Sequence, residues 1–491
     1  MFPRLFDLRK WILLPKRMIL VCVVCCTSFL QYPVSAQTEL RDQAIDAMRR
    51  AAGYFHDHVA THGGYVYHYS LDLQQRWGEG VASNDQIWVQ PPGTPTVGLA
   101  FLEAYQATAD PFYLDAATDA ADAIRYGQLR SGGWTNAIDF DPKGSRSANY
   151  RNGRGRGKNN SSLDDGQTQA AIQLLVTVDR ALNFHNLRIH SAAVSSLDAL
   201  LAAQFPNGGF PQVWTGPVKP QPVLRANFPQ YDWRTENRIK NYWDMYTLND
   251  NVTGYVADTL ITAYRAYDES RYITALKNLG EFLILAQMPL PQPGWAQQYD
   301  YAMHPIWARK FEPPGVSGDE TQEVIETLIK IAWETGDPRY LEPIPKAIEW
   351  LKHSLLPDGQ LARYYELKTN RPLYMTRNGD QYSLTYDDSR LPSHYGWKIA
   401  NRLGTLAQGY SECRRFLSTQ TSASKPADPP VDPQRVREII QSLDDQDRWI
   451  STFDGTPLVG QLKLPLGTKY LSSRVFSDHL RILSRYIKES R

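Results

Sequence analysis

Apolar residues recur along most of the chain at the spacing of one helix face. Leu175, Val178 and Leu182, for example, lie three and four positions apart among polar neighbours. Such stretches come in pairs that are joined by a short turn and followed by glycine and a large residue. The large residues that close these units, at intervals of roughly 65–85 residues, are Tyr65, Trp134, Phe210, Trp295 and Leu361.

Helical hairpins that each bury one face against a neighbour stack into a toroid or a solenoid. We therefore predict an all-α fold, an (α/α) toroid or barrel of helical hairpins with long irregular loops that form a substrate groove. The glycines let the chain turn back after the second helix, which places the following large residue on the loop face. A basic Gly/Asn loop at 143–160 and a Pro-rich stretch at 216–242 interrupt the repeat.

Residues 1–36 have the pattern of a secretory signal peptide. Five basic residues accompany an apolar run, Met18–Leu30, that is short for a membrane span, and Ala36 ends a small-residue cleavage motif. An uncleaved N-terminal anchor is the alternative. We expect a secreted or periplasmic protein built from a toroid over 37–417, a Pro/Ser/Ala-rich linker over 418–434 and a helical tail over 435–491 that docks on the toroid.

The composition is that of a folded protein, with 42% hydrophobic and 21% charged residues and a formal net charge of +1. Removal of the signal peptide takes away five basic residues and one acidic residue, which leaves a slightly negative remainder. An acidic substrate must therefore be bound by a local basic site. A single cysteine, Cys413, lies outside the expected signal peptide. We therefore expect neither an internal disulfide nor a cysteine-based metal site.

Two clusters of Asp and Asn precede helices at equivalent places in successive units. They comprise Asp164 and Asp165 in the first cluster, and Asn249, Asp250 and Asn251 in the second. Such side chains cap helix N-termini, and their oxygens are also the ligands that Ca²⁺ prefers. Equivalent positions of neighbouring repeats lie side by side, so both clusters are expected to face one cavity. Capping and cation binding remain open at this point.

Arg309 lies two positions after Trp307 in an extended, Pro-bounded stretch at 305–314. An arginine among aromatic rings suits a cleft for an acidic sugar, because the guanidinium can pair with a carboxylate while the rings pack against the sugar. The alternative is a structural ion pair with Glu312 or Asp319.

A second arginine-rich segment follows at 361–380. It contains Arg363, Arg371 and Arg377 close to two tyrosines. Because arginine pairs with carboxylates bidentately and stacks on rings, this segment also suits an acidic polysaccharide. A solvated charged loop would have the same composition.

Taken in this order, the four motifs resemble those of the pectic acid lyases of polysaccharide lyase family 10. The similarity covers roughly residues 150–400 and is most specific at 307–313 and 361–372. The resemblance implies an (α/α) toroid that cleaves polygalacturonate by β-elimination with Ca²⁺ as its cofactor. The sequence departs from the family pattern at several positions of the motifs, which affects the calcium ligands and the substrate preference more than the fold: Asp165, Gln167, Asn251 and Asn378.

The resemblance also implies roles for individual residues. Arg309 takes the place of the catalytic base, and Asp164 that of an essential acidic residue beside the scissile bond. Asp250 and Asp165 would bind the calcium ion. Burial beside Ca²⁺ and other arginines would favour the neutral guanidinium that a base requires. Five side chains would contact the substrate: Arg363, Arg377, Arg371, Gln297 and Trp307.

Two other functions fit the same residues. A helical-toroid hydrolase acting on uronides would use Asp164 or Asp250 as its general acid and would need no metal. A non-catalytic protein would keep the groove and bind pectate without turning it over. In each case the expected partner is an acidic polysaccharide, with no nucleic acid and no membrane, and we expect the chain to be a monomer.

Overall fold

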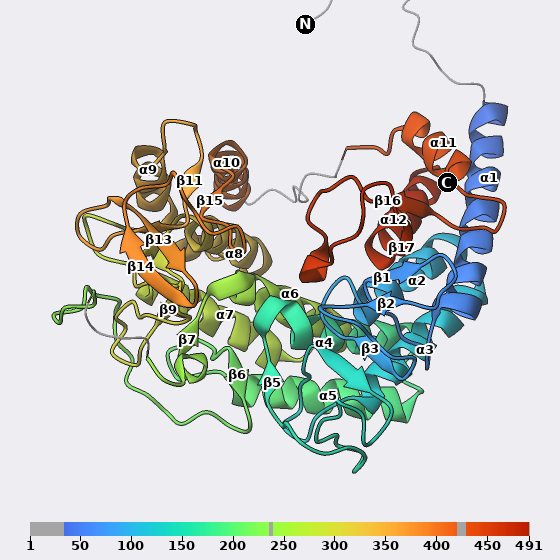
Figure 1. Ribbon diagram of the computed structural model, residues 1–491, viewed down its shortest axis with the longest axis horizontal. Helices are drawn as coiled ribbons and strands as arrows, with labels where there is room; N and C mark the ends of the chain where they lie inside the picture. The colour runs from blue at the N-terminus through green and yellow to red at the C-terminus, as the bar shows by residue number, and fades with distance from the viewer. Residues whose placement is uncertain (1–33, 235–238, 420–428, 491) are drawn as a thin grey trace, which may run out of the picture.

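The computed structural model describes residues 34–234, 239–419 and 429–490. Residues 1–33 of the expected signal peptide lie outside these ranges. Helical hairpins follow one another along the described chain (Figure 1). They are α2 (Thr94–Thr108) with α3 (Pro111–Tyr126), α4 (Gln167–Ala181) with α5 (Leu187–Ala202), α6 (Val252–Tyr267) with α7 (Ser270–Leu285), and α8 (Gly318–Thr335) with the turn η5 (Pro338–Leu341) and α9 (Ile344–His353).

Helices of successive hairpins pack side by side in the order α12 (Ser473–Glu489), α2, α4, α6, α8 and α10 (Leu403–Thr419). Against α12 pack α11 (Pro433–Gln441) and α1 (Val34–Tyr54), which continues into the π-helical turn η1 (Phe55–Val59). Figure 1 shows that the array is curved, with α10 and α12 near its two ends. The predicted fold, an (α/α) toroid of repeated helical hairpins, is confirmed.

The large residue after each glycine anchors a loop. Trp134 and Trp295 are fully buried, and each indole N–H donates to a carbonyl of the preceding helix at 2.8 Å. The backbone N–H of each tryptophan donates to a threonine hydroxyl at the start of the next hairpin, Thr168 or Thr321, at 3.0 Å. These residues lie in the loops, as predicted. Because they are buried, however, they fix the loops in place and do not line a groove.

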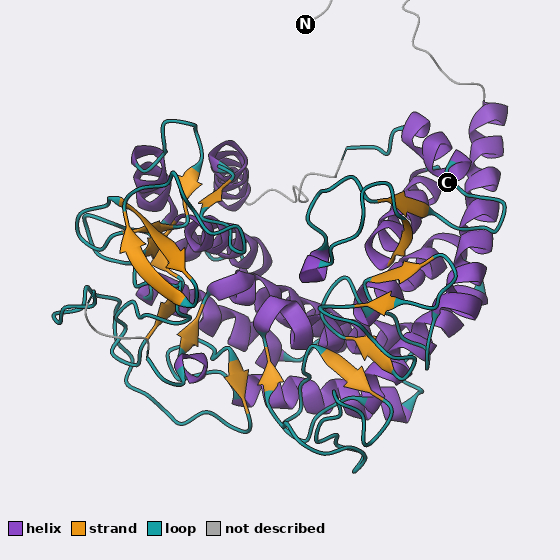
Figure 2. Cartoon of the chain, viewed as in Figure 1, coloured by secondary structure: helices purple, strands orange, loops and turns teal. Residues whose placement is uncertain are grey.

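Short strands join the loops to one another (Figure 2). The largest sheet has the order β14 (Gln381–Thr385), β13 (Pro372–Asn378), β12 (Tyr364–Tyr365), β10 (Val316–Ser317) and β8 (Trp295–Ala296). A second sheet has the order β16 (Ile450–Thr452), β17 (Lys469–Ser472), β1 (His68–Ser70) and β2 (Arg76–Trp77). The two-stranded pairs are β3 (Gln86–Trp88) with β4 (Ala137–Asp139), β5 (Ser161–Ser162) with β6 (Val213–Trp214), β7 (Tyr246–Thr247) with β9 (Gln298–Tyr299), and β11 (Leu361–Ala362) with β15 (Lys398–Ile399).

The C-terminal tail packs against the N-terminal end of the array. The ring of Phe476 on α12 stacks on that of Phe55 at 3.9 Å between centroids, and β17 pairs with β1 in antiparallel register. A loop of the tail carries η6 (Val459–Gln461). The side chain of Cys413 is buried and free. Of the helices in the described ranges, none combines the length and the apolarity that a membrane span requires.

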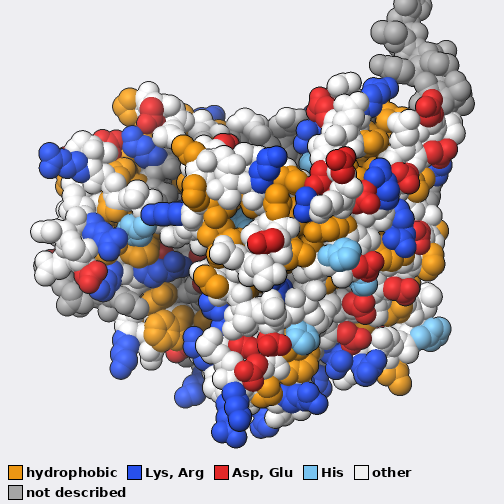
Figure 3. Space-filling view, turned by 45° about the vertical axis from the view of Figure 1, so that its right-hand side comes forward, with side chains coloured by type: hydrophobic (Ala, Val, Ile, Leu, Met, Phe, Trp, Pro, Cys, Tyr) orange, Lys and Arg blue, Asp and Glu red, His pale blue; other side chains and the backbone are white. Residues whose placement is uncertain are grey.

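The face drawn in Figure 3 carries basic and acidic side chains interspersed with apolar ones. This distribution agrees with the near-zero formal charge of the chain. Long-range attraction of a polyanion is therefore weak, and recognition of an acidic ligand depends on close contacts within a site.

Candidate active site

Two equivalent turns bring the aspartates of neighbouring repeats together. The 3-10 turns η2 (Asp164–Gly166) and η4 (Asn249–Asn251) precede α4 and α6 and contact each other. Asp165 and Asp250 occupy the same position in the two turns and both have left-handed backbones, with φ of +46° and +52°. No side-chain capping hydrogen bond forms at the start of either turn or of the helix after it. Capping therefore does not account for these aspartates.

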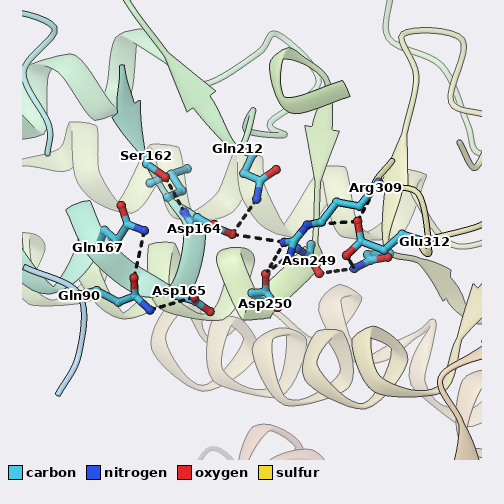
Figure 4. Close-up of polar contacts among 12 residues, drawn as sticks. Gln90, Ser162, Asp164, Asp165, Gln167, Gln212, Asn249, Asp250, Arg309 and Glu312 are labelled. Atoms are coloured by element: carbon cyan, nitrogen blue, oxygen red, sulfur yellow. Dashed lines mark hydrogen bonds and ion pairs between the residues drawn. The ribbon is translucent and has the colours of Figure 1, made fainter. Parts of the chain in front are cut away.

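Arg309 reaches both turns from the loop between β9 and β10 (Figure 4). Its Nη2 atom lies 3.3 Å from Asp250 Oδ2 and 3.8 Å from Asp164 Oδ1. Its Nε atom lies 3.3 Å from Glu312 Oε2, so the structural ion pair considered from the sequence also exists. One guanidinium thus joins carboxylates from three segments of the chain.

Buried polar side chains hold this arrangement. Glu312, 2% exposed, accepts the backbone N–H of Arg309 at 2.9 Å and the amide of Gln297 at 3.3 Å. The amide of Gln297 also donates to Asn249, and that of Gln212 donates to Asp164 at 2.6 Å. The side chain of Gln297 is 5% exposed and positions Asn249 and Glu312, and its predicted contact with substrate stays a prediction.

The three aspartates carry more negative charge than their surroundings offset. Burial, with Asp164 and Asp165 nearby, raises the pKa of Asp250 well above its ordinary value although Arg309 opposes the shift. Burial, Asp164 and Glu79 raise the pKa of Asp165 to about 6. The centre therefore favours binding of a cation or of protons.

The protonation state of Arg309 in the substrate-free chain follows from two opposing effects. Burial does lower the pKa of Arg309, but the charges of Glu312, Asp250 and Asp164 outweigh this effect and raise the pKa above its ordinary value. The guanidinium of the substrate-free chain is therefore firmly protonated.

The raised pKa of Asp165 predicts how the stability of the fold depends on pH. The folded chain keeps the Asp165 proton up to about pH 6, whereas the ordinary value is 3.8, so ionisation between these pH values destabilises the fold. Asp165→Asn should therefore be more stable than wild type above pH 6, by about 1 kcal/mol after discounting for solvent screening, and equal to it below pH 4. Urea unfolding at pH 4 and pH 7.5 would measure this difference. Asp115→Asn, a change at an exposed position of α3, is the control. If Asp165→Asn gained stability only at pH 4, the raised pKa of Asp165 would be contradicted.

The other predicted arginines lie at different distances from the centre. Arg363 is close to it: its guanidinium stacks on Tyr395 at 4.6 Å, but it pairs with Asp319 at 3.3 Å and Glu320 at 3.6 Å and is 12% exposed. Arg371 lies just before β13, with its guanidinium over the Tyr386 ring at 3.6 Å. Arg377 lies on β13, with its guanidinium over the Tyr382 ring at 5.6 Å. Trp307 is half-buried against the core.

A cavity of about 320 Å³ adjoins the first aspartate turn. Its lining includes Lys158 from the basic Gly/Asn loop, Trp243 beside the Pro-rich stretch, and Ser162 and Gln167, which flank Asp164. Sequence reasoning flagged both loops as irregular but did not assign Lys158 or Trp243 to a site. An ammonium group and an indole in one cavity form a suitable site for an acidic sugar.

Oxygen ligands dominate this centre. The side chains of Asp164, Asp165, Asp250 and Asn249 offer the hard donors that Ca²⁺ binds. Across the ranges that the structure describes, no three His, Cys, Asp or Glu side chains are grouped so as to hold a metal ion by themselves. Binding of a calcium ion at this centre therefore stays a prediction.

Fold and site together define a helical toroid with an arginine–carboxylate centre at the junction of two repeats. Residues 128–362, a little under half of the chain, match the model of the family described as pectic acid lyase. The resemblance found in the motifs is thereby confirmed.

Solved structures with a similar chain fold include lyases and sugar epimerases. A family 10 polysaccharide lyase from Cellvibrio cellulosa is 20% identical, with 60% of this chain and 91% of that chain covered and a TM-score of 0.45. A mutant of such a lyase from the same organism, in complex with trigalacturonic acid, is 19% identical, with coverages of 64% and 98% and a TM-score of 0.45. Cellobiose 2-epimerase from Bacillus thermoamylovorans B4167 is 13% identical, with coverages of 93% and 99% and a TM-score of 0.46. Among curated proteins the sequence has no match.

Proposed function

We propose that this chain is an exported pectate lyase that cleaves polygalacturonate by calcium-dependent β-elimination, with Arg309 as the base. The match of residues 128–362 to the pectic acid lyases supports the reaction class. One observation carries the residue assignment: Arg309 Nη2 lies 3.3 Å from Asp250 and 3.8 Å from Asp164, so a base candidate and two candidate cation ligands share one centre.

The reaction converts a uronate residue into an unsaturated one. Arg309 accepts the proton from C5, which lies α to the carboxylate, and the C5–H electron pair forms the C4=C5 double bond. The C4–O bond breaks, its electron pair stays on the oxygen, and this oxygen takes a proton from water. Lys158 and Trp243 would hold a neighbouring sugar by its carboxylate and its ring.

Asp165 and Asp250 are the proposed calcium ligands, with Asp164 beside them. A calcium ion bound there supplies positive charge to the substrate carboxylate, on which negative charge accumulates as the C5 proton leaves. Arg363, which is near this centre, would add a second positive charge. Its ion pairs with Asp319 and Glu320 keep the guanidinium in place.

Arg309 must lose a proton before it can act as a base. In the substrate-free chain its pKa is raised by Glu312, Asp250 and Asp164. Once Asp164 and Asp250 are engaged by a cation and substrate, Glu312 remains as the main carboxylate that stabilises the protonated form. The neutral fraction still grows with pH, so kcat should rise on the alkaline side, by about tenfold per pH unit at most.

One observation favours hydrolysis as a second candidate function. A carboxyl group whose pKa is about 6, such as Asp165, can keep its proton near neutral pH and donate it to a glycosidic oxygen. This reaction would need no metal and would add water across the bond, so its product would contain no double bond.

Incubation with polygalacturonate separates these possibilities. Purified protein with Ca²⁺ should release products that absorb in the ultraviolet, because the new double bond is conjugated to the carboxylate. An excess of chelator should lower this rate by about 100-fold or more. New reducing ends without absorbance, unaffected by chelator, would instead identify a hydrolase. Binding of the polymer without either product would identify a non-catalytic protein.

A further inference from the structure

A second cavity, of about 570 Å³, lies beside Asp165 and is lined on one side by the C-terminal tail. We call it the tail cavity, and its polar and aromatic lining comprises Glu79, Gln90, Asp165, Tyr255, Gln461 and Arg474. In Figure 4, Gln90 lies on the side of Asp165 away from Arg309, so this cavity extends the centre in the opposite direction from that arginine. The region that matches the pectic acid lyases ends at 362, before both tail residues.

The tail loop is fixed against the N-terminal part of the chain. His68 Nε2 lies 3.2 Å from the carbonyl oxygen of Val459, and burial lowers the pKa of His68 to about 4, so the neutral ring donates this hydrogen bond at neutral pH. Gly460 has φ of +78°, and a Cβ atom there would lie 2.4 Å from the carbonyl oxygen of Gly78. The loop therefore forms a wall of the cavity whose position depends on close backbone contact.

Arg474 is a cation without a protein partner in the described ranges. It is exposed in the first turn of α12, where a positive charge interacts unfavourably with the positive end of the helix dipole. No ion pair or hydrogen bond of its guanidinium is found among the residues that the structure describes, whereas Arg481 and Arg485 on the same helix pair with Glu103 and Glu489. Stability of the fold therefore does not explain a basic residue at this position.

The remaining lining complements a uronic acid residue. Such a sugar presents one carboxylate, several hydroxyls and an apolar C–H face. Tyr255, 39% exposed on α6, offers a ring for the C–H face. Gln90 Nε2 donates to Glu79 at 3.1 Å and to Asp165 at 2.9 Å, which leaves further lone pairs of both carboxylates for hydroxyl donors. Arg474 supplies the charge that the sugar carboxylate needs.

We propose that the tail cavity is a subsite for an acidic sugar residue of the substrate, in which Arg474 pairs with the sugar carboxylate and Tyr255 packs against the ring. This inference rests on the proposed function and extends it, because the C-terminal tail becomes part of the polysaccharide site. Chains long enough to reach from the cavity of Lys158 to the tail cavity gain contacts at both.

Binding of trigalacturonate to the full-length chain with Ca²⁺ tests the subsite. Calorimetry is done in an Arg309→Lys background, in which cleavage of the ligand is slowed by at least about 100-fold. Arg474→Ala should raise Kd about tenfold, as expected for one charged hydrogen bond lost. Arg485→Ala, a change on the same helix away from the cavity, is the matched control and should leave Kd unchanged. Arg474→Lys should recover part of the loss.

Each outcome decides a different question. An equal Kd for the parent and Arg474→Ala, with unchanged thermal unfolding, would overturn the subsite and leave the proposed function standing. A failure of the parent to bind trigalacturonate at all would overturn the proposed function together with the subsite. Gly460→Val, which displaces the tail loop, provides a second check and should weaken binding as Arg474→Ala does.

Discussion

Arg309→Ala should lower kcat on polygalacturonate by about 10³-fold, because it removes the group that takes the C5 proton. The same substitution leaves Glu312, 2% exposed, without its guanidinium partner. An unpaired buried carboxylate costs about 3 kcal/mol of stability, so loss of activity in this variant alone would be ambiguous. Initial rates of ultraviolet absorbance should therefore be measured on samples whose folding has been checked by thermal unfolding.

Arg309→Lys resolves this ambiguity. Lysine keeps a positive charge beside Glu312 but reaches the substrate with a different geometry and acidity, so we expect a stable protein whose kcat is still reduced by at least about 100-fold. Lys310→Ala changes the exposed neighbour and should retain full activity. If Arg309→Lys retained more than a tenth of the wild-type kcat, Arg309 would be a binding residue and another group would take the proton.

The helical part of the fold follows directly from the sequence because its causes are local. Spacing such as that of Leu175, Val178 and Leu182 requires neighbours within two helical turns, and the glycine after each hairpin marks the turn. The role of the closing side chains was harder to predict. Trp134 and Trp295 find carbonyl and threonine partners in helices before and after them, and this burial depends on how hairpins pack.

The repeat also made part of the site predictable. Asp165 and Asp250 occupy equivalent positions, so stacking of neighbouring hairpins is enough to bring them together. In the substrate-free chain the charges of Glu312, Asp250 and Asp164 raise the pKa of Arg309, and the neutral guanidinium expected beside Ca²⁺ stays a prediction. For Arg363, the motif does not reveal how its guanidinium pairs with Asp319 and Glu320, which lie more than forty positions away.

Four residues near the two ends of the chain were not predicted from the sequence. Gln90 and Glu79 come from the loops before α2, while Gln461 and Arg474 come from the tail, and all four line one cavity. Nothing in their local sequence indicates chemistry, since each becomes part of a site only when the two ends of the chain pack together. Sequence motifs do not reveal such contacts, because they form only when α12 packs on α2 in the folded chain.

Asp250→Asn should separate activity from stability. The substitution removes the charge of a proposed calcium ligand, so kcat/KM should fall by about 10²–10³-fold and respond only weakly to added Ca²⁺. Without substrate or Ca²⁺, however, the variant should unfold at a higher temperature than wild type near pH 7.5. Burial and the charges of Asp164 and Asp165 raise the pKa of Asp250, so ionisation at this pH destabilises the fold and the neutral amide does not.

The choice of asparagine follows from the backbone. Asp250 has φ of +52°, a conformation that asparagine tolerates and alanine adopts at a cost, so Asp250→Ala would add strain to the loss of charge. Asp258→Asn lies on the same helix as the turn's continuation, α6, and breaks an exposed ion pair with Lys330 of α8, so it is the matched control with little effect on either measurement. A variant at 250 that is both less active and less stable would mean that Asp250 supports the fold through Arg309. If Asp250→Asn is more stable and also loses its response to Ca²⁺, a functional role of the Asp250 carboxylate explains both results.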